Sequence, residues 1–184
     1  MNFLQKMRDD MGFKLLKRTV KKLKHQRTFN NLSSASSVGI LCDTFAEESF
    51  LATVSFAEDL VKSGLKVTIL GYVLNESMAN YLPKKEGFSV FSRPIVNWLG
   101  YPKEASVSNF VSEEFDILIN LSTRSEELCI NYSMGMSKAK LRVSPKLKSD
   151  MFADFILQLS QETVRDTQKL INCIKEYLSA FSKA

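Results

Sequence analysis

Hydrophobic positions in the first half of the chain fall into short apolar runs separated by a stretch with helical spacing. Val38–Cys42 is a short apolar run and Lys66–Val73 is a β-branched one, and both patterns favour strands. Between them, Phe45–Lys62 has helical periodicity and ends at Ser63-Gly64, where glycine favours a helix C-terminus. This strand–helix–strand order predicts a βαβ unit, with two parallel strands joined by a right-handed crossover.

The second half of the chain continues the alternation less regularly. The expected strands are Phe88–Phe91, Asp116–Leu121, Ala139–Val143 and Phe152–Leu159, and the expected helices are Ala105–Ser112, Glu126–Met136 and Glu162–Phe181. The segment Asn97–Pro102 is expected to be a loop or an edge strand. Asp116–Leu121 is almost continuously apolar, as expected of a central strand covered on both faces. The alternation predicts a three-layer, doubly wound, Rossmann-like α/β domain with a mostly parallel sheet.

The N-terminal segment has two apolar stripes at helical spacing. They are Phe3, Leu4, Met7 and Met11, followed by Phe13, Leu16, Val20 and Leu23. The stripes lie on different sides of a helix with Gly12 between them, so we expect either two short helices with a joint at Gly12 or one helix with two buried faces. We divide the chain into a basic helical arm (1–29), a polar linker (30–37) and a single α/β domain (38–184).

Charge is concentrated in the arm. Residues 1–27 carry nine Lys/Arg against two Asp, a net charge of +7, whereas the other 157 residues carry 16 Lys/Arg against 18 Asp/Glu, a net charge of −2. The candidate phosphate-binding residues are Lys14, Lys17, Arg18, Lys21, Lys22, Lys24 and Arg27. Such asymmetry indicates a polyanionic partner, and we favour RNA.

Two other interpretations of the arm stay open. The helix could lie on an anionic bilayer and bury Phe13, Leu16, Val20 and Leu23. Alternatively, this stripe packs on the domain while the charges are only solvated.

A set of polar residues follows two of the expected strands. In a doubly wound sheet, ligands bind beyond the carboxyl ends of the strands, where the sequence places Asp43, Thr44, Asn120, Ser122 and Thr123. These side chains could hold a small molecule or a nucleotide-sugar. A structural alternative is helix capping, because residues 44–47 and 123–126 both match the capping-box pattern.

Other constellations argue against common enzyme classes. The loop after the first strand lacks glycine, and neither GxxxxGK[ST] nor GxGxxG occurs, which argues against a dinucleotide-dependent enzyme or a P-loop NTPase. The single histidine, His25, is in the arm, and the three cysteines are dispersed. We therefore assign no catalytic residue, metal or cofactor. Trp98 and Tyr101 form an aromatic loop that could stack on a base, or more simply pack on the edge of the domain.

The sequence also resembles a known protein family. The matching segments are a basic N-terminal helix, Ser-Val-Gly-Ile-Leu-Cys-Asp (37–43), Leu-Gly-Tyr-Val (70–73), Asn-Trp-Leu-Gly-Tyr-Pro (97–102), Glu-Phe-Asp-Ile-Leu-Ile-Asn-Leu-Ser (114–122) and Ser-Lys-Ala-Lys (137–140). They are similar to those of an uncharacterised family of small intracellular proteins from Bacteroidota. The resemblance implies an intracellular α/β protein and carries no catalytic residue.

Three functional hypotheses follow. The leading one is a non-enzymatic, cytoplasmic RNA- or ribosome-associated protein whose arm grips phosphates while the α/β domain contacts a partner. The alternatives are a small-molecule-binding or glycosyltransferase-like, nucleotide-sugar enzyme module, and a peripheral protein of a membrane surface. The oligomeric state is left open.

Overall fold

Strands and helices alternate along the chain as the hydrophobic pattern predicts. The computed structural model describes residues 3–43, 46–73, 88–92, 96–123, 127–146 and 152–180. The helices are α1 (Phe3–Lys22), α2 (Glu47–Lys62), α4 (Ala105–Ser112), α5 (Leu128–Met136), α6 (Gln161–Arg165) and α7 (Thr167–Ala180). The strands are β1 (Ser37–Asp43), β2 (Lys66–Val73), β3 (Phe88–Ser92), β4 (Ile117–Asn120), β5 (Leu141–Pro145) and β6 (Phe155–Leu157).

The six strands form one sheet in the order β3-β2-β1-β4-β5-β6. Every neighbouring pair is parallel, including the outer pairs β2–β3 and β5–β6. The chain winds outward from β1 in one direction and then from β4 in the other, which is the strand order of the Rossmann fold. The predicted doubly wound sheet is therefore confirmed, and its topological switch point lies between β1 and β4.

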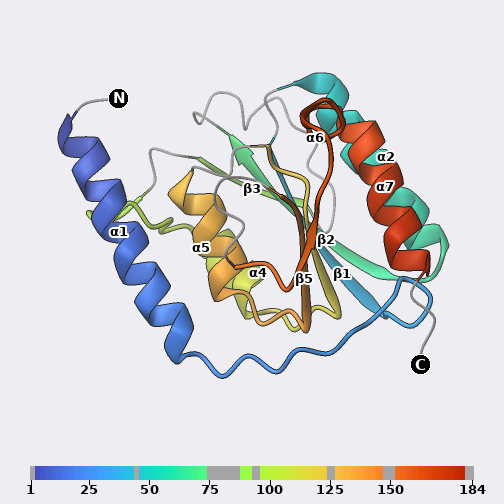
Figure 1. Cartoon of the computed structure of the whole chain (residues 1–184), viewed down its shortest axis with the longest axis horizontal. Helices are drawn as coiled ribbons and strands as arrows, with labels where there is room; N and C mark the ends of the chain where they lie inside the picture. The colour runs from blue at the N-terminus through green and yellow to red at the C-terminus, as the bar shows by residue number, and fades with distance from the viewer. Residues whose placement is uncertain are drawn as a thin grey trace.

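The sheet is covered on both faces because successive strand residues point to opposite sides. Ile40 and Cys42 of β1 pack in one core with α2 and α7, and Leu41 between them packs in a second core with α4 and α5. Figure 1 shows α2 and α7 together on one side of the sheet, with α4 and α5 on the other and α1 stacked outside α5. The molecule thus has three layers and one additional helix.

α1 is one continuous helix, so of the two expected arrangements the joint at Gly12 is absent. The helix has one buried face and not two, because Leu4, Met7 and Met11 of the first stripe are exposed. A Cβ atom built on Gly12 would collide with the carbonyl oxygen of Leu99 and would lie 2.7 Å from Leu128 Cδ2. Glycine is present here because α1 passes close to the backbone of another segment, which a side chain would prevent.

The expected C-terminal helix is divided into α6 and α7 at Asp166. Ser160 caps the start of α6 by accepting a hydrogen bond from Thr163 N (3.1 Å), and Asp166 accepts one from Lys169 N (3.0 Å) in the first turn of α7. The apolar stripe continues through the break, which is why hydrophobic spacing alone predicts one helix.

Candidate functional site

Apolar contacts anchor α1 on the α/β domain. Leu16 is 1% exposed and belongs to the core beneath α4 and α5. The Phe13 ring meets Phe152 edge to face, with centroids 6.0 Å apart. A Cβ on Gly135 of α5 would lie 2.8 Å from Val20 Cγ2, so glycine allows the two helices to approach closely. The stripe from Phe13 to Val20 therefore faces the domain.

This packing corrects one expectation. Leu16 is buried and Phe13 and Val20 are half-buried against the domain, whereas Leu23 remains 44% exposed. A bilayer cannot bury a stripe that the domain already covers, so the membrane interpretation is wrong for this face of α1.

The same packing turns the basic side of α1 toward solvent. All seven candidate phosphate-binding residues are exposed: Lys14, Lys17, Arg18, Lys21, Lys22, Lys24 and Arg27. Within the described part of the chain, Arg27 is the one member of this set that pairs with a carboxylate, at 2.9 Å from Asp154 Oδ1. We call the other six cations the basic face. None of them forms an ion pair with a described residue.

Asp154 is the centre of a network that fixes the segment after α1. Its side chain is 3% exposed, and His25 Nε2 lies 2.9 Å from its Oδ2 atom. Arg142 donates to the same oxygen from its backbone N (2.9 Å) and from Nε (3.2 Å). Nη1 of Arg142 also donates to the carbonyls of Met134 and Gly135 at the end of α5, which a cation satisfies well.

The network keeps the Asp154 carboxylate ionised. Burial alone would raise the pKa of Asp154, but the Arg142 charge and the hydrogen bonds from His25 and Arg142 hold it below its usual value. Arg27 adds an ion pair at Oδ1 without the alignment of a hydrogen bond. His25 is therefore a structural partner of this carboxylate and links the end of the arm to the domain.

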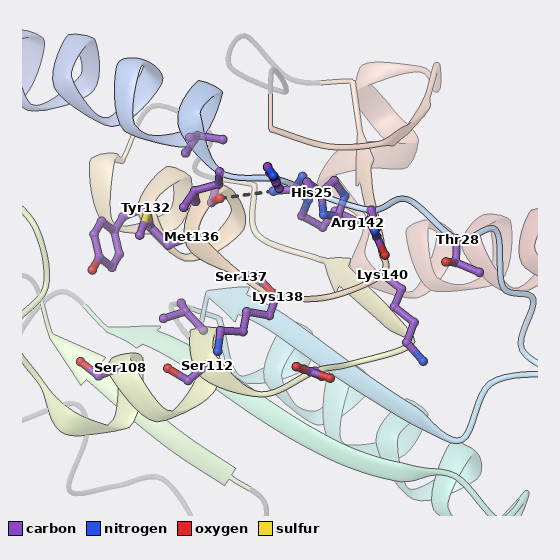
Figure 2. Close-up of a pocket in the computed structure, with 17 residues that line it drawn as sticks. His25, Thr28, Ser108, Ser112, Tyr132, Met136, Ser137, Lys138, Lys140 and Arg142 are labelled. Carbon is purple, nitrogen blue, oxygen red and sulfur yellow. Dashed lines mark hydrogen bonds between the residues drawn. The ribbon is translucent and has the colours of Figure 1, made fainter.

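A groove of about 720 Å³ opens between the segment after α1 and helix α4 (Figure 2). Ser108 and Ser112 of α4 line one side, Tyr132 of α5 lines another, and Lys138 reaches across toward Ser112. The groove lies at the amino end of β5, because Lys140 immediately precedes that strand. Its volume is in the range of pockets that bind small ligands. The ligand site predicted from the sequence, at the carboxyl ends of the strands, is at the opposite edge of the sheet.

Two of the cations that line the groove are already neutralised. Lys140 Nζ lies 2.7 Å from Asp116 Oδ1. This bond raises the pKa of Lys140, and although burial alone would raise the pKa of Asp116, the bond with Lys140 helps hold it low. Arg142 is likewise neutralised by Asp154.

The uncompensated charge of the groove comes from Lys24 and Lys138. Both are exposed, and neither has an ion-pair partner among the described residues. Glu114 is the one carboxylate among the described lining residues. The groove therefore continues the basic face of α1 around the end of the helix.

At the carboxyl end of the sheet, four of the five predicted polar residues form a cluster. Asp43 Oδ2 accepts hydrogen bonds from Ser122 Oγ (3.2 Å), Thr123 N (2.8 Å) and Thr123 Oγ1 (3.0 Å). Asn120 accepts a bond from Ser122 N (3.0 Å) and donates one to Ser144 Oγ (3.1 Å). The cluster spans the ends of β1, β4 and β5, at the switch point.

The capping interpretation of these residues is wrong for the described ones. The N-cap of α2 is Ala46 and that of α5 is Glu127, and neither makes a side-chain capping bond. The Thr123 hydroxyl bonds to Asp43 instead. Thr44 lies outside the described residues. Ser144 was missed because the expected strand ended at Val143, one residue before it.

The aromatic loop is a turn fixed to the side of α1. Asn97 Oδ1 accepts hydrogen bonds from the backbone N of Leu99 (2.9 Å) and of Tyr101 (3.0 Å), and the Tyr101 hydroxyl donates to Gly12 O (2.8 Å). Tyr101 is half-buried, as expected of packing on the domain edge, but Trp98 is 71% exposed. The packing interpretation holds for Tyr101 and is wrong for Trp98.

The described residues carry few signs of other chemistry. Cys42, Cys129 and Cys173 form no disulfide, and burial, with the nearby Asp43 charge, raises the pKa of Cys42 so that it stays a neutral thiol. No group of three or more His, Cys, Asp and Glu in the described part of the chain could hold a metal ion. No helix among the described residues is both long and apolar enough to cross a bilayer.

Comparison with known proteins gives a family but no activity. No curated protein matches the sequence. A family match covers residues 8–181, which includes α1 from its second turn, the groove, the Asp154 network and the switch-point cluster. Over nearly its whole length, the chain therefore belongs to the family described as "family of unknown function (DUF6913)".

Proposed function

We propose that this chain is a non-enzymatic RNA-associated protein, acting on the ribosome, in which the basic face of α1 grips phosphates. The observation that carries the proposal is that α1 is anchored through Leu16, while five cations of the helix and Lys24 just after it face solvent without described ion pairs. Cations on a fixed helix lose less conformational entropy on binding than cations on a flexible arm. More of the favourable electrostatic free energy therefore contributes to affinity.

The groove supports the same proposal. Lys138 extends the basic face to the end of the domain, where Tyr132 and two serine hydroxyls line a concave surface. A duplex is too wide for such a groove, whereas unpaired nucleotides can place phosphates beside the lysine and bases beside the tyrosine ring. As part of this proposal, the protein would act in the cytoplasm of a bacterium of the Bacteroidota.

The direct test is the salt dependence of binding to fluorescein-labelled single-stranded RNA, measured by fluorescence anisotropy. Substituting Lys14→Gln, Lys17→Gln and Lys21→Gln together removes three exposed charges from the basic face. Each lost contact to single-stranded RNA should lower the slope of log K against log salt by about 0.7, or about 2 for the triple variant. Affinity near 0.1 M salt should fall at least about tenfold.

A matched control separates the basic face from total charge. Lys62→Gln, Lys103→Gln and Lys146→Gln remove three exposed charges outside α1 and should leave the slope nearly unchanged. Equal losses in both triple variants would mean that only net charge matters. Absence of RNA binding at low salt, or of co-sedimentation with ribosomes in sucrose gradients, would contradict the proposal.

A second candidate, from a different class, is binding of a small molecule, such as a sugar or a nucleotide-sugar, at the switch point. It is supported by the cluster of Asp43, Ser122 and Thr123 at the position where doubly wound sheets bind ligands. A thermal-shift screen of sugars, nucleosides and nucleotide-sugars tests it, because a bound ligand stabilises the fold. A hit whose stabilisation persists in Thr123→Val would not be bound at this cluster.

A further inference from the structure

The outward side of α1 carries apolar residues that the domain does not cover. Leu4 is 71% exposed, Met7 55%, Met11 48% and Leu15 41%. Their spacing of three, four and four residues places them on one line along the helix, opposite the buried Leu16. We call these four residues the outward stripe.

The exposed tryptophan stands beside the same stretch of helix. A Cβ on Gly100, two residues after Trp98, would lie 3.0 Å from Asp9 Oδ1, and Leu99 meets Gly12 directly. The Tyr101–Gly12 hydrogen bond fixes the turn to α1, so Trp98 is held on the surface beside the stretch of helix that carries the outward stripe. Figure 1 shows this segment passing beside α1.

Burying these side chains would be favourable, and nothing within the described residues does so. A large apolar side chain gains about 1.5–3 kcal/mol when it leaves water. Isolated apolar residues are common on surfaces, but four on one helical line with a neighbouring tryptophan form a patch of the kind found at interaction sites.

From this surface we infer that α1 docks in the plane of an anionic lipid bilayer, with the outward stripe and Trp98 in the interface. Charge decides the choice of occupant. Lys14, Arg18 and Lys22 continue the outward line toward the end of the helix, so one face presents apolar residues first and cations after them. A bilayer surface offers acyl chains and negatively charged headgroups to such a face. Tryptophan is favoured at the depth where both meet.

A second copy of the chain fits this surface poorly. Pairing two α1 helices would bring together two helices that each carry seven Lys/Arg against two Asp, a net charge of +5. The stripe is also a narrow convex line that continues into cations, and a fluid surface accepts it without shape complementarity because long cationic side chains can extend toward the headgroups.

This inference goes beyond the proposed RNA function: its apolar residues have no part in RNA binding, although the two proposals share the cations Lys14, Arg18 and Lys22. The outward stripe runs from Leu4 to Leu15, whereas the RNA contacts come from Lys14 onward and from the groove beyond the end of α1. The membrane hypothesis drawn from the sequence placed a different face of α1 in the bilayer. That face, from Phe13 to Val20, is the one that the domain covers.

The test uses the full-length chain and liposomes of phosphatidylcholine with or without 30% phosphatidylglycerol, as a probe composition of roughly bacterial anionic charge. Sedimentation of the chain with the anionic liposomes at low salt is expected, with much less on neutral ones. Trp98 is the only tryptophan, so its fluorescence should shift to the blue and become protected from iodide when the turn enters the interface.

The decisive variant combines Leu4→Gln, Met7→Gln and Met11→Gln, which should lower the liposome partition coefficient by about tenfold or more. The control combines Leu51→Gln and Val61→Gln, which are similarly exposed on α2 at the other side of the sheet. The control should bind liposomes as the parent chain does.

Three outcomes would overturn the inference: no binding to anionic liposomes at low salt, binding unchanged in the stripe variant, or Trp98 emission that does not shift on binding. Anisotropy with RNA on the same variants keeps the two proposals distinguishable. The stripe variant should retain RNA affinity, while the lysine variant should lose it.

Discussion

Replacing Asp154 by asparagine should detach the chain after α1 from the domain. The substitution keeps the shape of the side chain but removes its charge. In the parent chain, three hydrogen bonds converge on Oδ2, from His25 Nε2, Arg142 N and Arg142 Nε. Each of them is made to an ionised carboxylate. The Arg142 guanidinium would stay buried with its remaining bonds to the end of α5.

The expected loss follows from these bonds. Hydrogen bonds to charged groups contribute roughly 1.5–3 kcal/mol and neutral ones roughly 0.5–1.5, so each bond should weaken by about 1 kcal/mol. Three bonds give about 3 kcal/mol, at the lower end of the cost of breaking a buried ion pair. For a chain of this size that corresponds to a fall in Tm of about 6–12 °C.

Urea unfolding of the parent chain, Asp154→Asn and Asp59→Asn measures this loss. Asp59 is an informative control because its side chain is 53% exposed and its two lysine partners lie 3.8 Å away. An exposed pair of this kind contributes at most about 1 kcal/mol. If Asp154→Asn costs no more than Asp59→Asn, the network does not hold the segment after α1 to the domain.

The pH dependence carries a definite sign. Because the pKa of Asp154 is lowered in the folded state, its contribution is complete above the unfolded value of about 3.9 and is lost as pH falls through the folded pKa. The stability difference between the parent chain and Asp154→Asn should be constant from pH 7 down to about pH 5 and shrink only below about pH 4. A difference that disappears near neutral pH would contradict this assignment.

Two further results are expected. Leu16→Ala should cost about 2–5 kcal/mol in urea unfolding because Leu16 is 1% exposed, whereas Leu15→Ala, 41% exposed, should cost less than about 1 kcal/mol; similar losses would mean that α1 does not pack on the domain. Cys173 should react with a thiol reagent in the folded chain well before the buried Cys42 and Cys129, as stopped-flow absorbance would show, and a fast Cys42 would contradict its raised pKa.

Periodicity predicts the fold because the apolar pattern of each strand records which of its faces are covered. Val38–Cys42 and Asp116–Leu121 read as strands since both faces of the sheet are covered, and they pair as β1 and β4 at its centre. Where a glycine serves a close approach, the sequence is ambiguous. Gly12 looks like a helix joint until the Leu99 carbonyl is placed beside it.

The candidate sites depend on long-range proximity that no local pattern contains. His25 and Asp154 are 129 residues apart and Asp43 and Ser122 are 79 apart, so their bonds appear only in the folded chain. The switch-point set could still be named, because strand ends meet at one edge of a parallel sheet. The groove could not, since it forms where a helix end, a linker and two other helices converge. The exposure of Trp98 was likewise hidden, because the turn that presents it is fixed by α1.

The distribution of charge on α1 supports the proposal that this helix binds a polyanionic partner outside the domain. Lys14, Lys17, Arg18, Lys21 and Lys22 form like-charge pairs at spacings of three and four residues, and each such pair destabilises a helix by roughly 0.2–0.5 kcal/mol. Leu16 and the Asp154 network hold the helix in place against this repulsion without neutralising it. A surface needed only for packing would gain from acidic residues at these positions, which the sequence lacks. A polyanion removes the repulsion on binding, so phosphates of RNA or of lipid headgroups would stabilise the fold as they bind.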